Sequence, residues 1–262
     1  MYDYRNIDWL AHHGVQGQKW HVKHGPPYPL SRQKGSGRLV GKVTINKNKS
    51  KNDDYRYTHK RPKYVQPIPG IKIKTVPETT MTKDILAVNP NVESGDEYQT
   101  NCLYCSLTME MRCRGYDVQA QPVNKKYNDY AYTEKIKDWG SYNGLFSPPS
   151  TVNVLKTSVY DTNKIPTDQE KEQLRQNAKT IIQKMPNNAR GEMSFAWDYN
   201  NEDGHSVFFE KSSEGDVLII DSQWSEVWSI DDCELFMSAS AVTFNRLDNL
   251  DIDINKVKDF CK

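Results

Sequence analysis

A pair of cysteines opens the stretch NCLYCSLTMEMRCRGYDV, whose pattern predicts a short helix. Thr100 or Asn101 can cap the start of this helix, and Gly115 can end it with a left-handed backbone. Its apolar residues recur every four positions, at Leu103, Leu107 and Met111. Cys102 then lies in the first turn, where unpaired N–H groups and the helix dipole favour a thiolate. We therefore predict that Cys102 is a nucleophile and that Cys105, one turn later, packs in the core or supports the site.

The base for such a nucleophile has one strong candidate. Five of the six histidines lie before residue 60, which leaves His205 alone in the rest of the chain. Three predicted strands with short turns surround it, EMSFAWDY, HSVFF and VLIID. Antiparallel pairing of neighbouring strands should place His205 beside Asp221. A carboxylate there fixes the imidazole tautomer and stabilises the imidazolium, as Cys/His/Asp catalysis requires.

Charge divides the chain of 262 residues into two parts. Residues 1–74 hold 16 Lys and Arg against 4 Asp and Glu, a net charge of +12, and the remaining 19 basic and 30 acidic residues give −11. The first part is rich in Gly, Pro, Lys and Asn and poor in apolar clusters, a composition typical of disordered segments. We therefore expect a basic, extended and largely disordered arm over residues 1–85 and a folded domain over 86–262.

The other segments have patterns typical of a structural framework, and none has the pattern of a membrane-spanning helix. The segment 168–185 has the pattern of an amphipathic helix with an apolar stripe. That stripe comprises Leu174, Ala178, Ile181 and Ile182. No apolar run approaches the roughly 18 residues that cross a bilayer, and the N-terminus lacks the order of a signal peptide. We expect no contact with a membrane and synthesis in a cytoplasm.

Two motifs carry a resemblance to a known family. NCLYCSLTMEMRCRGYDVQAQP, followed by GHSVFFEKSSEGDVLIIDSQW, resembles the papain-fold toxin domain of bacterial polymorphic toxins and of some phage structural proteins. That family consists of cysteine-nucleophile enzymes grouped with glutamine deamidases. The resemblance runs from about residue 89 to the C-terminus. It implies an α+β, papain-like cysteine hydrolase fold, with an N-terminal catalytic helix packed on an antiparallel sheet.

The resemblance also implies roles for individual residues. By motif, Asn101 and Cys102 supply the nucleophile, Gly204 and His205 the base, and Asp221 the orienting acid. Gln223 lies close to that acid. Gln99 is the position that matches an oxyanion donor, together with the backbone N–H of Cys102. The implied reaction is hydrolysis of a glutamine side chain in a protein substrate to glutamate, with release of ammonia, by a toxin or host-modifying effector.

Two other functions stay open at this point. A papain-like peptidase that acts on structural or host proteins would use the same residues with a different leaving amine. A capsid-associated or nucleic-acid-associated binding protein that has lost catalysis is the non-enzymatic alternative, and an unreactive Cys102 would favour it.

The N-terminal part carries a second resemblance. LAHHGVQGQKWHVKHGPPYPL, which contains the box HHGVQGQKW, is similar to a short box of phage head-associated proteins, although His21 replaces the usual glycine. This implies a phage or prophage product in the virion or the host-cell cytoplasm. The basic arm could then contact the capsid or packaged nucleic acid, where neutralised phosphates release counterions. A toxin of this kind would also have an immunity protein as a partner.

The cysteines and histidines do not form a recognisable metal motif. Cys102 and Cys105 could be half of a zinc site, but no second CxxC or CxxH follows. The N-terminal histidines lack carboxylates and a fixed element. We therefore expect no metal and no cofactor. A Cys102–Cys105 disulfide would be strained on a helix, whereas pairing with Cys233 or Cys261 stays open.

Overall fold

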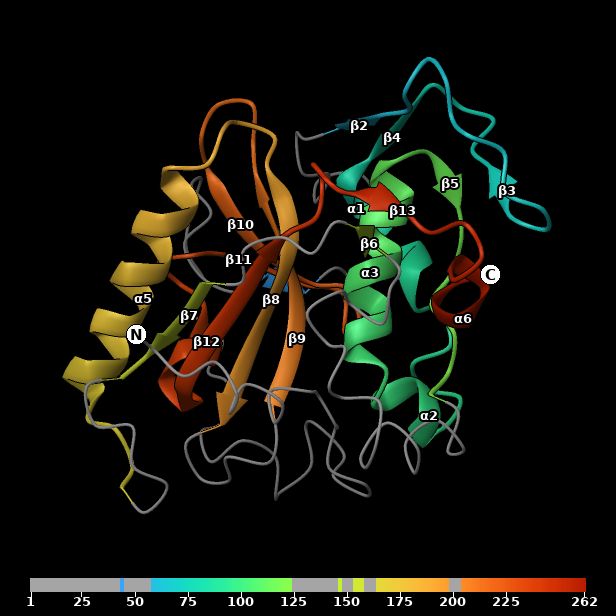
Figure 1. Cartoon of the computed structure of the whole chain (residues 1–262). Coiled ribbons are helices and arrows are strands. Elements are labelled where there is room, and N and C mark those ends of the chain that lie inside the picture. The colour runs from blue at the N-terminus through green and yellow to red at the C-terminus, as the bar shows by residue number, and fades with distance from the viewer. Residues whose placement is uncertain (1–42, 45–57, 124–145, 148–152, 158–163, 198–203) are drawn as a thin grey trace.

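A seven-stranded antiparallel sheet forms the centre of the computed structural model, which describes residues 43–44, 58–123, 146–147, 153–157, 164–197 and 204–262 (Figure 1). Its strands in chain order are β1 (Val43–Thr44), β7 (Asn153–Lys156), β8 (Arg190–Trp197), β9 (Gly204–Lys211), β10 (Val217–Asp221), β11 (Glu226–Ser229) and β12 (Ala239–Arg246). The spatial order is β1-β11-β10-β9-β8-β12-β7, so β8, β9 and β10 are neighbours, joined in sequence by short connections. The mixed helix and strand content with antiparallel pairing agrees with the predicted α+β class.

Three two-stranded pairs and several helices surround this sheet. The pairs are β2 (Thr58–Lys60) with β4 (Glu78–Thr80), β3 (Lys72–Ile73) with β5 (Tyr116–Asp117), and β6 (Phe146–Ser147) with β13 (Asp251–Ile252). The helices are α1 (Met81–Val88), α2 (Asp96–Gln99), α3 (Cys102–Cys113), α5 (Asp168–Gln183), the 3-10 helix η4 (Glu234–Ser238) and α6 (Val257–Phe260). Within the described residues, no helix has the length and apolar character needed to cross a membrane.

Helices cover both faces of the sheet, with α5 on one face and α3 on the other (Figure 1). The α5 face contributes Leu174, Ala178 and Ile182, which pack with sheet residues such as Phe195 and Phe209. This confirms the predicted amphipathic helix. Thr167 and Glu170 form a reciprocal capping box at its start, which satisfies two otherwise free N–H donors.

Helix α3 is buried on both sides, and eleven of its twelve residues are buried. One side packs against the sheet through Cys105, Met109 and Cys113. The other side carries the predicted stripe, Leu103, Leu107 and Met111. The helix ends as predicted, because Gly115 has a φ of +100°, and a Cβ there would lie 2.8 Å from the side chains of Arg61 and Val65. The helix is therefore a central element of the fold, held in one position from two directions.

The stripe on α3 is covered by a segment that the composition had assigned to the arm. Val65, Ile68 and Ile71 pack against it together with residues of the C-terminal segment. Strands β2, β3 and β4 and most of α1 also precede residue 86. Described residues before 86, among them β1 in the central sheet and the segment from Thr58, therefore belong to the folded structure, because they pair with its strands or cover its helix. The box HHGVQGQKW lies outside the described residues.

Candidate active site

His205 and Asp221 lie at the same end of the sheet, on the neighbouring strands β9 and β10. The register pairs Ile220 with Phe208, so Asp221 lies opposite Val207, two residues from His205. Such diagonal neighbours in an antiparallel pair are within reach of longer side chains. Nε2 of His205 lies 2.7 Å from Oδ2 of Asp221, and both side chains are buried. The contact expected from the strand pattern is therefore present.

The second carboxylate oxygen of Asp221 is held by the backbone of the turn that follows. Oδ1 accepts a hydrogen bond from the N–H of Gln223 at 3.0 Å and another from the N–H of Trp224 at 3.2 Å. The turn therefore fixes the carboxylate with Oδ2 directed to the imidazole.

The imidazole of His205 is surrounded by groups that favour its protonated form. Burial alone would lower its pKa, but the Asp221 carboxylate and its hydrogen bond raise it, and the adjacent Cys102 adds to this, so the pKa rises to about 10. On the neighbouring strand β8, the Trp197 indole stacks on the ring at 6.4 Å between centroids and 15° between planes. The ring is thus fixed in orientation and carries a proton at neutral pH.

Cys102 is the first residue of α3, and its side chain lies close enough to His205 to help raise the pKa of that imidazole. Because Asp221 occupies Nε2, the ring nitrogen that remains for the thiol is Nδ1. The position at the helix start also places the sulfur near free N–H groups and the positive end of the dipole. Cys102 thus lies beside a histidine at the start of a helix, the arrangement that nucleophilic catalysis by a cysteine requires.

Asn101 joins the nucleophile helix to the loop that carries Asp221. It was expected to cap α3, and it does occupy the N-cap position, but its side chain makes no capping hydrogen bond. Instead, Oδ1 accepts from Nε2 of Gln223 at 3.1 Å and from Nδ2 of Asn89 at 3.3 Å, while Nδ2 donates to the Gln121 carbonyl at 3.0 Å. The Asn101 side chain therefore links three segments of the chain and does not cap the helix.

Cys105 is distinguished from Cys102 by its surroundings. Its thiol donates to Oδ1 of Asn101 at 3.2 Å. Burial raises its pKa well above the usual range, and the neighbouring Cys102 and Asp221 act in the same direction. The thiol form is therefore favoured, and Cys105 packs in a buried core cluster, while its supporting role in the site stays a prediction. All five cysteines are free thiols, so no long-range disulfide forms with Cys233 or Cys261.

Three residues near the site differ in how far the sequence could identify them. Gln99, the expected oxyanion donor, ends α2 half-buried, and its role stays a prediction. Asn89 and Trp197 were missed, because neither belongs to a recognisable motif. An aromatic residue at the end of the strand paired with a histidine is a weak signal that would have indicated Trp197.

Comparisons with known proteins do not identify a family for this chain. No family model and no curated protein matches the chain. Among solved structures, the Pseudomonas avirulence protein AvrPphB is similar at 14% identity, covering 64% of this chain and 91% of that one, with a TM-score of 0.29. A likeness at that TM-score shows neither a fold nor an activity, so the site is interpreted from its own residues.

Proposed function

We propose that the chain is a papain-like cysteine hydrolase of amide bonds, with Cys102 as nucleophile, His205 as acid and base, and Asp221 as orienting residue. The observation that supports this most strongly is the buried contact between His205 and Asp221 beside the first residue of α3. The His205 ring has a carboxylate on Nε2, and the side chain of Cys102, the first residue of α3, is its second neighbour. That combination favours proton transfer to and from a sulfur nucleophile.

The proposed reaction conserves atoms and protons at each step. The Cys102 thiolate attacks the carbonyl carbon of the substrate amide, and the oxyanion is stabilised by the backbone N–H of Cys102 and, by resemblance, by Gln99. Collapse breaks the C–N bond, and the amine leaves with the proton of the His205 imidazolium. Water, deprotonated by the now neutral His205, then hydrolyses the thioester and regenerates the thiolate.

The resemblance of the motifs around Cys102 and His205 favours a glutamine side chain of a protein as the substrate. The leaving amine is then ammonia, and the product carries a new carboxylate. A virion or host-cell setting follows from the N-terminal box in the same way, and its residues lie outside the described part of the chain. Hydrolysis of a peptide bond would use the same residues. The two reactions differ in the leaving group, which is ammonia in deamidation and the amine of a peptide in proteolysis.

Two measurements test this proposal in sequence. Iodoacetamide labelling of the folded chain, read by mass spectrometry, should modify Cys102 selectively, and His205→Ala should slow that modification at neutral pH. Cys233→Ser, which removes a buried thiol on the α5 side of the sheet, should leave it unchanged. Equal or absent labelling of all five cysteines would refute the nucleophile and favour a binding protein.

The second measurement identifies the bond that is cleaved. With benzyloxycarbonyl-glutaminylglycine and denatured casein as probes, we expect ammonia release by the wild type and none by Cys102→Ala. New amino termini without ammonia would show that the chain is a peptidase. Neither product, in a chain whose Cys102 labels selectively, would overturn the assignment to these amide substrates while leaving the nucleophile in place.

A further inference from the structure

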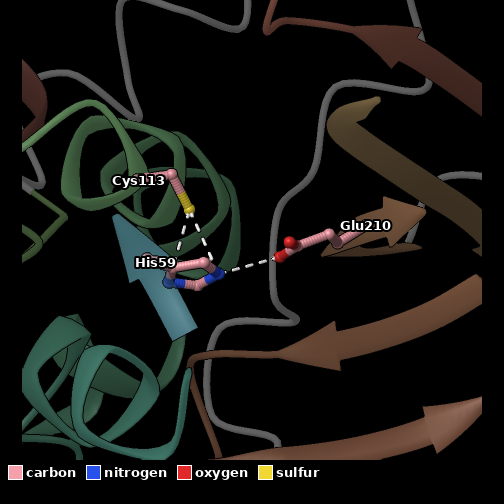
Figure 2. Close-up of side chains that lie close together, drawn as sticks. All are labelled: His59, Cys113 and Glu210. Atoms are coloured by element: carbon pink, nitrogen blue, oxygen red, sulfur yellow. Dashed lines mark hydrogen bonds and ion pairs between the residues drawn. The ribbon is translucent and has the colours of Figure 1, made fainter. Parts of the chain in front are cut away.

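A second cluster of chemically active side chains lies at the other end of the two elements that carry the active site. His59 on β2, Cys113 on α3 and Glu210 on β9 are all buried, and their ligand atoms lie within 4.8 Å of one another. Figure 2 shows the Cys113 sulfur directed at the His59 ring and the Glu210 carboxylate facing the same ring. These three residue types, converging from three elements far apart in sequence, are typical ligands of a transition metal.

Two of the three ligand-atom distances in this cluster are near those of a zinc site. Oε2 of Glu210 lies 2.9 Å from Nε2 of His59, and Sγ of Cys113 lies 3.8 Å from the same nitrogen. Bonds of about 2.3 Å to sulfur and about 2.0 Å to nitrogen and oxygen place tetrahedral ligand atoms about 3.3 to 3.5 Å apart. Because Sγ is equally far from Nδ1, the Cys113 side chain must rotate toward Nε2 to bind.

The surroundings of His59 already have the form of a metal site's outer shell. Its other nitrogen, Nδ1, lies 2.8 Å from Oδ2 of Asp84. Oδ1 of Asp84 in turn accepts from Nζ of Lys74 at 2.6 Å and from Nε of Arg112 at 3.0 Å. A histidine ligand usually donates its second N–H to such a carboxylate, which fixes the tautomer and leaves Nε2 free to bind.

We propose that His59, Cys113 and Glu210 bind one Zn²⁺ ion, with Asp84 orienting the histidine. Thiolate, imidazole and carboxylate together suit zinc and exclude the hard cations Ca²⁺ and Mg²⁺, which prefer oxygen ligands. On binding, zinc replaces the proton between His59 and Glu210 and the proton of the Cys113 thiol. Without zinc, the doubly protonated His59 ring donates to both Asp84 and Glu210. Zinc binding must break the hydrogen bond to Glu210.

The position of the site indicates what zinc would do. Helix α3 begins with Cys102 and ends with Cys113, while β9 carries His205 near its start and Glu210 near its end. A metal at the far end therefore fixes the helix relative to the strand and also attaches β2 to both. This role is structural and independent of the proposed hydrolase activity. The expectation of no metal rested on the lack of a second CxxC or CxxH motif and on the N-terminal histidines, and it did not weigh His59 together with Glu210.

The test uses the full chain with Cys102→Ser, because Cys102 and His205 could themselves capture a metal. After chelation and buffer exchange, Co²⁺ is titrated as a spectroscopic probe and is then displaced by Zn²⁺, with bound metal counted by elemental analysis. We expect one ion per chain and a thiolate-to-cobalt charge-transfer band that zinc abolishes. Absence of stoichiometric binding would overturn the proposal.

Two further variants locate the ion. Cys113→Ser should remove the charge-transfer band and weaken zinc binding at least about 10-fold, whereas Cys261→Ser, another buried thiol, should change neither. Glu210→Gln keeps a hydrogen-bond acceptor for His59 and should retain the band with similarly weakened binding. Circular dichroism checks that each variant is folded, and unchanged affinity in either folded ligand variant would place the metal elsewhere. If Cys113→Ser does not fold, Glu210→Gln decides the question.

Discussion

Replacement of Asp221 by Asn tests the electrostatics of the candidate triad with the smallest change in shape. The carboxylate lies 2.7 Å from Nε2 of His205, and its charge is the largest influence that raises the pKa of this histidine to about 10. An adjacent opposite charge typically shifts a pKa by about 1 to 3 units. We therefore expect His205 in Asp221→Asn to titrate between roughly 7 and 9, which corresponds to about 1.4 to 4 kcal/mol less stabilisation of the imidazolium.

The same substitution also reverses the hydrogen bond. The Asn amide can still accept from the turn N–H groups through its oxygen, and its NH₂ group then faces Nε2 of His205. The neutral ring must accept there, so it carries its proton on Nδ1 and cannot receive the proton of Cys102. We expect amide hydrolysis to fall by about 10²-fold or more, the range of general acid–base catalysis.

The measurement is an NMR titration of the histidine ¹³Cε1 signals, with His205 assigned from its absence in His205→Gln. Asp251→Asn, a change of an exposed carboxylate on β13, is the matched control and should leave the pKa of His205 near the wild-type value. A pKa near 10 in Asp221→Asn would refute the assignment of Asp221 as the charge partner. An equal decrease in the control would attribute the effect to net charge instead.

Three further predictions concern stability, each measured by urea unfolding. Asn101→Ala leaves the buried amides of Gln223 and Asn89 without their shared acceptor and should lower the free energy of unfolding by about 1 to 3 kcal/mol, whereas no loss would show that water replaces the bridge. Because the folded pKa of His205 is raised to about 10, its stabilisation is complete below its unfolded pKa near 6.5 and is lost as the pH rises toward 10. Cys102→Ser removes the thiol, which would otherwise exchange a proton over the same pH range. Between pH 6.5 and 8.5 this variant should therefore lose up to roughly 1.4 kcal/mol per pH unit relative to the double variant that also carries His205→Gln, and parallel curves would contradict the raised pKa of His205. Gly115→Ala should cost about 1 to 2 kcal/mol because φ is +100°, and a neutral result would show that the loop relaxes.

Local patterns were sufficient for the elements that carry the candidate triad. The four-residue apolar repeat and Gly115 predicted α3, and short turns between apolar runs predicted that His205 lies near Asp221. These features depend on neighbours in sequence, such as the residue spacing of a helix or the pairing of adjacent strands. The periodic pattern of apolar residues in the sequence therefore indicates such local elements directly.

Composition was a poorer guide to long-range packing. The segment after Thr58 has few apolar residues, yet Val65, Ile68 and Ile71 cover α3, because a buried helix needs only a few side chains on its outer side. His59 was assigned to the arm for the same reason, and its partner Glu210 is 151 residues away. No sequence spacing indicates such a contact. Asn101 differs again, since its cap position was predicted and its side chain found better partners in tertiary structure.

The anchoring of Asp221 has a consequence for which substitutions the following turn can tolerate. Oδ1 is held by main-chain N–H groups at positions 223 and 224, and every residue except proline supplies such a group. The carboxylate is therefore held without a hydrogen bond from the side chain at position 224, so replacing Trp224 by any residue but proline keeps both N–H donors. Proline is the exception there, since it would remove a donor while leaving Cys102, His205 and Asp221 themselves intact.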